Sequence, residues 1–290
     1  RVTVLANVAS PEELAIAIDA GAEGIGLLRT ELAFLEAPGW PTVAEHAAAL
    51  APILEGLGEL PAVIRVLDFG ADKCPPFLRG TPQRGIGLLL ANPDAYAAQL
   101  EALVRAAQHH DVRILLPLVD RPEQVAQTRA LLGRLGVQRS SIVGSMIETP
   151  RAAQQADAIA ARSDFLSIGT NDLTAATLGA DRFKPNGATA LHPKVLRSIA
   201  RSVDAAHGAG IAIEVCGEAA SDPAMVPLLV GLGVDQLSVG AARVGAVRAL
   251  IRRLNAAEAS GLARSALTMA SAAEVESICA EHAAYAGAPR

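Results

Sequence analysis

The sequence predicts a single (β/α)8 barrel of the TIM type over residues 1–290, and three observations support this fold class. The chain has 290 residues, a usual length for such a barrel. Hydrophobic residues make up 51% of it and aromatic residues 3%, a composition that favours parallel strands covered by helices. Eight short apolar segments are each followed by a helical pattern. An open doubly wound sheet is the alternative fold.

The eight expected strands occupy residues 2–8, a segment that ends at Arg29, and residues 62–69, 112–119, 142–148, 165–168, 211–217 and 235–239. Helices are expected from Pro11, through residues 49–54, and over 93–108, 122–135, 152–161, 192–207, 223–232 and 247–254. Residues 74–83 are rich in proline and glycine and are expected to form a loop. The tail to Arg290 is alanine-rich, which predicts two more helices.

Charge and composition exclude several classes of function. The net charge of −5 gives no basic field for nucleic acid. No run of about 18 apolar residues is present, so no membrane insertion is expected. The three cysteines lack metal-ligand spacing, and their odd number argues against a disulfide framework, which favours the cytoplasm. The chain begins at Arg1 directly in a strand pattern, and we therefore expect it to be a fragment of a longer protein.

Polar residues gather where the predicted strands end. Asn171 and Asp172 follow the buried strand at 165–168, and Glu148 ends the strand before it. In a parallel barrel these strand ends converge on one face, where such enzymes place their active sites. Asn-Asp alone would more often be a helix N-cap. The convergence predicts a functional cluster, whose members are Arg29, Arg65, Glu148, Asn171, Asp172, Cys216 and Glu218.

The side chains in this cluster indicate a chemistry. Up to four arginines can bind oxyanions, which suits a phosphate together with a carboxylate: Arg29, Arg65, Arg84 and Arg182. Glu148 and Asp172 are oxygen ligands of the kind that Mg²⁺ takes together with substrate oxygens. The predicted ligand is therefore a small molecule that carries phosphate and carboxylate, bridged by Mg²⁺. Cys216 is either a small core residue or a thiol that delivers a proton to carbon.

At these residues the chain resembles the C-terminal, phosphoenolpyruvate (PEP)-binding domain of Enzyme I of the bacterial sugar phosphotransferase system, a PEP-protein phosphotransferase. It also resembles the Enzyme I portion of multiphosphoryl transfer proteins. The similar segments cover nearly the whole chain in order: residues 24–31, 65–73, 146–150, 165–182 and 216–218.

This resemblance implies a role for each residue. Arg29, Arg65, Arg84, Asn171 and Arg182 would bind the phosphate and carboxylate of PEP, Lys73 would support the substrate, and Asp172 with Glu148 would bind Mg²⁺. Cys216 would protonate the enolate so that pyruvate leaves. The phosphoryl group would pass to a histidine on a separate N-terminal domain and then to the carrier protein HPr. The family's domain is also a homodimer.

Two departures and several alternatives accompany the resemblance. Gly87 stands where the family has the second arginine of its Gly-x-Arg-x-x-Arg run, and the loop from Lys73 to Arg84 is short. None of the six histidines lies in the family's Thr-Ser-His context, and His192 is expected to start a helix. The alternatives are the C-terminal domain of pyruvate phosphate dikinase or PEP synthase, a Mg²⁺-dependent lyase or aldolase acting on a pyruvate enolate, and a PEP sensor without catalysis.

Overall fold

The computed structural model describes residues 1–70, 73–136, 141–181 and 188–286, with side chains described as far as His282. Its eight strands are all parallel and close into a barrel in sequence order, with β1 also paired to β8. The expected (β/α)8 barrel is thereby confirmed. The strands are β1 Thr3–Val8, β2 Ile25–Arg29, β3 Ala62–Arg65, β4 Val112–Leu116, β5 Ile142–Ile147, β6 Phe165–Ile168, β7 Ala212–Val215 and β8 Gln236–Gly240.

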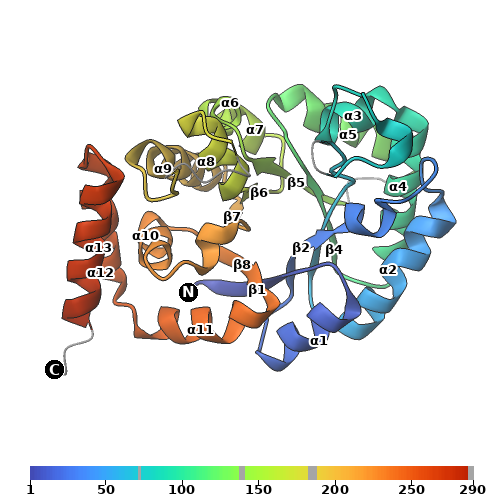
Figure 1. Ribbon diagram of the computed structural model, residues 1–290. Helices are drawn as coiled ribbons and strands as arrows, with labels where there is room; N and C mark the ends of the chain where they lie inside the picture. Colours follow the sequence, from blue (N-terminus) through green and yellow to red (C-terminus); the bar gives the residue numbers. More distant parts are fainter. Residues whose placement is uncertain (71–72, 137–140, 182–187, 287–290) are drawn as a thin grey trace.

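Helices surround this barrel, and two more lie outside the ring, at the left of Figure 1. The helices are α1 Pro11–Asp19, α2 Val43–Leu57, α3 Gly85–Ala91, α4 Pro93–Ala106, α5 Pro122–Arg134, α6 Pro150–Gln154, α7 Ala156–Ala160, α8 Thr170–Leu178, α9 Pro193–Gly208, α10 Met225–Leu232, α11 Val244–Arg253, α12 Ala256–Thr268 and α13 Ala272–Ala286. Short 3-10 helices cover Thr30–Phe34, Pro76–Leu78, Glu218–Ser221 and Ala241–Arg243.

Side chains fill the inside of the barrel, as expected for eight strands. One apolar cluster takes a residue from each of six strands or strand ends: Leu27, Val63, Leu115, Met146, Phe165 and Cys216. The ring of Phe165 lies so close to Gly144 on the neighbouring strand that a Cβ there would sit 2.3 Å from the ring. Glycine at position 144 therefore makes room for the aromatic side chain inside the barrel.

The helices bury a second and larger apolar core against the outside of the strands. Their starts carry the caps that the sequence contains: Ser10 accepts from Glu13 at α1, and Thr42 and Glu45 form a capping box at α2. His192 is the N-cap of α9, as expected, and its Nδ1 accepts from the Lys194 backbone at 3.1 Å. These caps fix where each helix enters the ring around the barrel.

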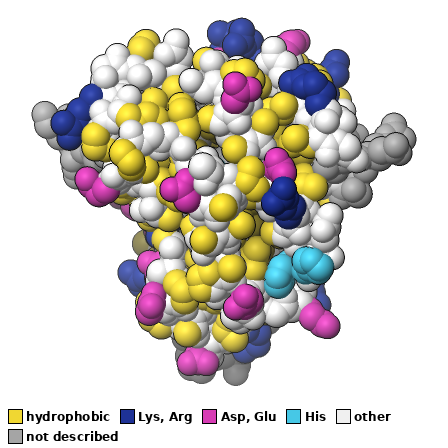
Figure 2. Space-filling view, turned by 90° about the vertical axis from the view of Figure 1, so that its right-hand side faces the viewer, with side chains coloured by type: hydrophobic (Ala, Val, Ile, Leu, Met, Phe, Trp, Pro, Cys, Tyr) yellow, Lys and Arg dark blue, Asp and Glu magenta, His cyan; other side chains and the backbone are white. Residues whose placement is uncertain are grey.

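The C-terminal helices α12 and α13 pack outside the ring, and α12 lies against α10 (Figure 1). The two helices can approach closely because Gly231 has no side chain. A Cβ at this position would lie 2.1 Å from the carbonyl oxygen of Ala259. The opposite side of the molecule, over α2 and α4, carries scattered charges among small hydrophobic side chains (Figure 2). No helix in the described part of the chain is long and apolar enough to cross a membrane.

Several elements differ from the expected ones. Strand β4 ends at Leu116 instead of at residue 119, and helix α3 was not expected. Strand β3 ends at Arg65, although the apolar run to Phe69 predicted a longer strand. Beyond Val66 the backbone leaves the ladder, because the amide of Leu67 donates to the side chain of Gln99 at 2.9 Å instead of to a neighbouring strand. The helix expected over 152–161 is divided into α6 and α7 at Gln155.

Candidate active site at the carboxyl ends of the strands

The polar residues predicted at the strand ends line one cavity. Arg29 and Arg65 are the last residues of β2 and β3, Glu148 and Cys216 directly follow β5 and β7, and Asp172 is in the first turn of α8. Together with Lys73 and Asn171 they surround a volume of about 380 Å³. Parallel strands bring their carboxyl ends to the same face, which is why residues 187 positions apart in sequence meet here.

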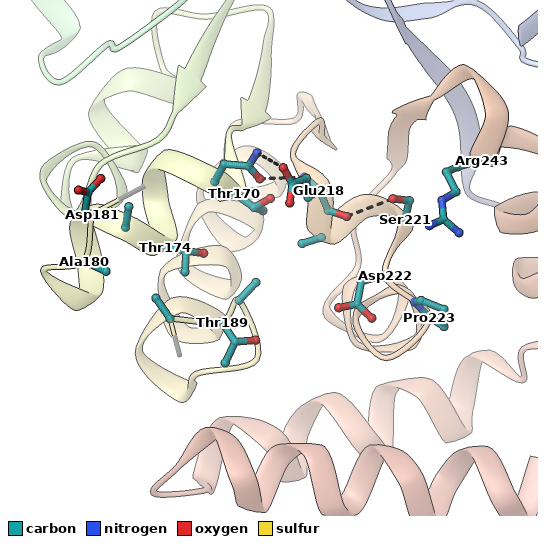
Figure 3. A pocket seen from close by; sticks show the side chains of 15 residues that line it. Thr170, Thr174, Ala180, Asp181, Thr189, Glu218, Ser221, Asp222, Pro223 and Arg243 are labelled. Carbon is teal, nitrogen blue, oxygen red and sulfur yellow. Dashed lines mark hydrogen bonds between the residues drawn. The ribbon is translucent and has the colours of Figure 1, made fainter. Parts of the chain in front are cut away.

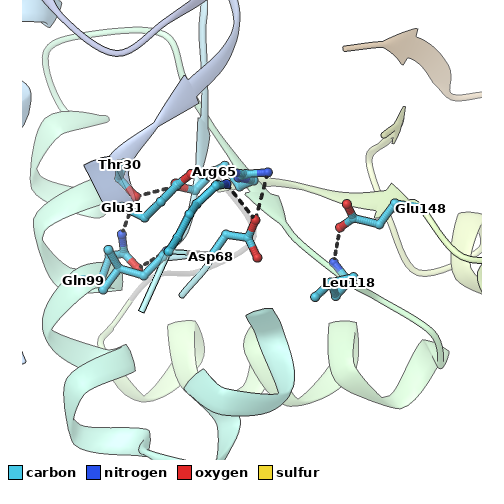
Figure 4. Close-up of polar contacts among 9 residues, drawn as sticks. Thr30, Glu31, Arg65, Asp68, Gln99, Leu118 and Glu148 are labelled. Carbon is cyan, nitrogen blue, oxygen red and sulfur yellow. Dashed lines mark hydrogen bonds and ion pairs between the residues drawn. The ribbon is translucent and has the colours of Figure 1, made fainter. Parts of the chain in front are cut away.

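One wall of the cavity is a group of paired charges (Figure 4). The guanidinium of Arg65 lies 2.5 Å from Glu31 Oε1 and 3.2 Å from Asp68 Oδ2. The ammonium of Lys73 lies 2.8 Å from the same Glu31 oxygen and 3.5 Å from Asp68. Glu31 is fully buried and Arg65 is 6% exposed, so neither charge would be tolerated without the other. The two cations are thus held at fixed positions beside the cavity.

Gln99 of α4 holds this wall in place from behind. Its carbonyl accepts from the Leu67 amide, and its amide donates to the Thr30 hydroxyl at 3.2 Å. Thr30 in turn donates to the carbonyl of Arg65 at 2.8 Å. The buried amide therefore joins the ends of β2 and β3, which carry the charged residues.

Arg29 enters the cavity from β2 with spare hydrogen-bonding capacity. It lies 3.5 Å from Glu13, and its buried Nε makes no hydrogen bond within the described residues. Arg29 lines the cavity, and a guanidinium with donors to spare can bind an anionic ligand there.

Glu148 is almost completely buried on the opposite wall, and its Oε1 accepts from the Leu118 backbone at 2.6 Å. Burial and the nearby carboxylates of Asp68 and Asp172 raise its pKa to about 8, and Arg65 opposes this rise. Like charges so close to one another would be relieved by a bound cation. Among the described residues no group of three or more His, Cys, Asp or Glu could hold a metal. Two carboxylates nevertheless fit Mg²⁺, which keeps waters and substrate oxygens as its other ligands.

Asn171 does not cap α8, because the N-cap position is Gly169 and Asn171 lies inside the first turn. Its amide instead donates to Glu218 at 3.2 Å, and its carbonyl accepts from the Glu218 backbone at 2.9 Å. This pair closes the gap between the loops after β6 and β7. Beyond it lies a second hollow of about 910 Å³, shown in Figure 3, which shares Asn171, Glu218, Ser221 and Arg243 with the cavity.

Cys216 lies at the floor of the cavity, where its side chain is 5% exposed. Its Sγ is 3.3 Å from the Ser167 hydroxyl and 3.6 Å from the carbonyl of Ile168. Burial is the largest cause that raises the pKa of this thiol, to about 12, so Cys216 holds its proton at neutral pH. A protonated thiol at the floor of an anion-binding cavity can donate a proton to a ligand above it.

Two predicted residues are not among those that line the cavity. Arg84 is the exposed N-cap residue of α3, and its side chain lies against Gly70. Arg182 lies outside the described residues. The cavity also contains polar residues that the sequence did not single out, among them Asn7, Glu13 and Arg243, and the buried Glu31 stands directly behind it. Glu31 had a signal, since it is two positions beyond Arg29 at the end of a predicted strand.

Comparison with known proteins decides which family this site belongs to. Residues 1–256 match the family described as PEP-utilising enzyme, PEP-binding domain. The chain belongs to this family. The resemblance seen in the sequence is thereby confirmed.

Curated relatives of the family are similar over nearly the whole chain. A multiphosphoryl transfer protein of Rhodobacter capsulatus is 40% identical over 96% of the chain, which covers 35% of that protein. A phosphoenolpyruvate-protein phosphotransferase of Geobacillus stearothermophilus is 35% identical over 96% of the chain, which covers 51% of it. The chain thus spans about half or less of these relatives.

Solved structures share the barrel at much lower identity. A citrate lyase from Burkholderia xenovorans covers all of this chain with a TM-score of 0.57 and 17% identity, over 94% of its own chain. A citrate lyase beta subunit from M. tuberculosis, complexed with oxaloacetate and magnesium, covers 87% of this chain with a TM-score of 0.53 and 18% identity, over 97% of its own. These likenesses support the fold alone.

Proposed function

We propose that this chain binds PEP together with Mg²⁺ in the cavity and supports transfer of its phosphoryl group to a histidine of a separate domain, then to HPr, with release of pyruvate. The observation that carries the proposal is one cavity lined by fixed cations, a close pair of carboxylates and a buried thiol. These are the parts that a phosphorylated carboxylic acid requires. The relatives named above make the same substrate and acceptor the first to test.

The cations would bind the anionic ends of the substrate. Arg65 and Lys73 are held by Glu31 and Asp68, so their positions are set before a ligand arrives. Arg29 and the amide of Asn171 would complete the contacts from the other strands. Preorganised positive charge stabilises charge that develops during phosphoryl transfer without reorganisation. Arg84 and Arg182 remain proposed substrate ligands. Arg84 is not among the residues that line the cavity, and Arg182 is outside the described residues.

Glu148 and Asp172 would hold Mg²⁺. The ion, when bound, supplies positive charge to the oxygens of the substrate. Cys216 would then give its proton to the methylene carbon of the enolate, which becomes the methyl group of pyruvate. The proposal also includes a homodimer, which the resemblance implies, and a cytoplasmic location, which the odd number of cysteines favours.

Calorimetry of the chain with PEP, with and without Mg²⁺, tests the binding step. We expect PEP to bind more tightly with Mg²⁺ than without it. Equal affinity in both conditions would contradict the assignment of Glu148 and Asp172 as Mg²⁺ ligands. Incubation with radiolabelled PEP tests the acceptor. Because transfer depends on an acceptor held in line, we expect only a trace of label and of pyruvate from the chain alone, and transfer once a phosphohistidine domain is attached. Stoichiometric label on a histidine of this chain would show that the acceptor is misplaced.

A further inference from the structure

A buried glutamate lies behind the thiol, inside the barrel. Ser167 of β6 and Glu214 of β7 stand opposite each other in the strand register, and the Ser167 hydroxyl is 2.6 Å from Glu214 Oε1. The same hydroxyl is 3.3 Å from Cys216 Sγ. The exposed fractions are 1% for Glu214, 0% for Ser167 and 5% for Cys216. One fully buried hydroxyl therefore connects a buried carboxyl group to the thiol at the floor of the cavity.

The surroundings of Glu214 determine its protonation. Its Oε2 is buried and has no hydrogen-bond partner within the described residues. Burial raises the pKa of Glu214 to about 8, while the Ser167 hydroxyl and the charge of Arg113 on β4 act in the opposite direction. On the remaining neighbouring strand, β8, the residue in register with Glu214 is the neutral Gln236. At neutral pH the carboxyl group therefore carries a proton most of the time.

We propose that Glu214 is a proton reservoir for Cys216 and that Ser167 relays the proton between them. The inference rests on the proposed function, since it concerns how the thiol that protonates the enolate is restored. Glu214 and Ser167 are positioning residues, because they act through Cys216 and do not touch the substrate.

The proton movements balance at each step. The S–H bond of Cys216 breaks as a C–H bond forms at the methylene carbon of the enolate, whose oxygen becomes the ketone oxygen of pyruvate. The Ser167 hydroxyl then gives its proton to Sγ, and the Glu214 carboxyl gives its proton to the Ser167 oxygen. The result is a neutral thiol, a neutral hydroxyl and a Glu214 carboxylate. When pyruvate has left, water in the cavity returns one proton along the same chain to Glu214.

The relay removes an unfavourable thiolate. Burial disfavours the anion of Cys216, and ionised Glu214 and Glu148 disfavour it further. A proton passed from the carboxyl group moves the negative charge to Glu214, where Arg113 favours it. The carboxyl group is the stronger acid of the two, so the charge comes to rest on the more stable anion.

Exchange of the methyl protons of pyruvate with D₂O tests the relay without a phosphoryl acceptor, because it is the reverse of the protonation step. Nuclear magnetic resonance follows the exchange in the 290-residue chain with Mg²⁺ and pyruvate. We expect exchange in the wild type, no exchange with Cys216→Ala, and a loss of roughly 100-fold with Glu214→Gln or Ser167→Ala, at the lower end of the usual range for proton-transfer groups. The concentration of pyruvate at half-maximal rate should not change.

The pH profile and a control separate a relay from a structural role. In the reverse direction Glu214 must accept a proton, so the wild-type rate should rise as pH increases through about 8, and Glu214→Gln should lose this rise. Ser145→Ala removes another buried hydroxyl, which is bonded to Ser163 at 2.8 Å, and should leave the rate unchanged.

Each outcome has one meaning. Wild-type rates and an unchanged pH profile in both Glu214→Gln and Ser167→Ala would overturn the relay while the proposed function stands. Equal exchange in the wild type and Cys216→Ala, or none in either, would overturn the role of Cys216 and the relay with it. If Ser145→Ala loses as much exchange as Ser167→Ala, the loss would come from disturbed packing inside the barrel, and the relay would also be overturned.

Discussion

The two sides of the barrel interior treat buried charge in different ways. On the paired side, at the ends of β2 and β3, the buried carboxylate of Glu31 meets both Arg65 and Lys73. On the opposite side, which we call the proton side, Glu148 follows β5 and Glu214 lies on β7. Both are buried, and burial is the largest cause that raises the pKa of each to about 8.

This difference separates two tasks. Opposite charges that satisfy one another keep their positions and their protonation states, which suits groups that must bind an anion at a fixed place. Carboxyl groups whose ionisation is unfavourable respond to a cation or give up a proton, which suits groups that take part in chemistry. The predictions below test this division, from the largest expected effect to the smallest.

Replacement of the thiol is the most direct test of the proton side. Cys216→Ser should still bind PEP but should lower the rate of pyruvate formation by roughly 100- to 10,000-fold, because a hydroxyl is a far poorer acid than a thiol. The rate is measured with the phosphohistidine domain attached, and binding by calorimetry. A wild-type rate in the serine variant would leave Cys216 with only a packing role.

Removal of one charge is the corresponding test of the paired side. Glu31→Gln keeps the shape but leaves Arg65 and Lys73 with Asp68 as their one remaining acidic partner among those described, and should lower the free energy of unfolding by about 3 kcal/mol. Urea unfolding measures the change. The matched control is Glu101→Gln, which removes an exposed partner of Arg105 on α4 and should cost only about 0.5 kcal/mol. Equal costs would show that the paired side is no more organised than the surface.

Loss of the second carboxylate tests the metal assignment. Asp172→Ala should weaken the Mg²⁺-dependent part of PEP binding by roughly 10- to 100-fold or more, since even groups that only support a metal ligand contribute this much. Calorimetry with and without Mg²⁺ measures it. Asp120→Ala is the control, because Asp120 pairs with Arg121 and Arg151 and does not line the cavity. Unchanged metal dependence in Asp172→Ala would contradict the assignment.

The sequence predicted the barrel and the place of the site because both follow from periodicity. Apolar strands alternate with helices, and residues at strand ends must converge once the barrel closes. Arg29 and Glu148 could therefore be assigned to the same cavity although they are far apart in the chain. The boundaries were less predictable, as β3 shows, because a hydrogen bond from Leu67 to the distant Gln99 decides where that strand ends.

The pairings inside the barrel were beyond the reach of the sequence. Nothing in the sequence spacing shows that Arg65 and Lys73 contact the same carboxylate oxygen of Glu31. Glu214 is one polar residue in an otherwise apolar strand, and its role depends on the neighbouring strand, which places Ser167 opposite it. Arg84 shows the converse, since its motif position predicted a site residue and the described structure leaves it exposed against Gly70.

The pH dependence of stability gives the smallest change from one pH unit to the next and the finest test of the proton side. Glu214 has its folded-state pKa raised from 4.5 to about 8, so its neutral form contributes stability that is fully present below about pH 4.5 and is lost as pH rises through 8. In this window the ionisation lowers the free energy of unfolding by up to about 1.4 kcal/mol per pH unit. Glu214→Gln cannot ionise, so its curve of stability against pH should be flatter, and above pH 8 it should be more stable than the wild type. Urea unfolding at pH 5 to 9 without Mg²⁺ measures both curves, with Ser145→Ala as a variant that removes no charge and keeps the wild-type slope. Parallel curves for the wild type and Glu214→Gln would mean that Glu214 is ionised in the folded protein. An ionised Glu214 would have no proton to give to Cys216 through Ser167.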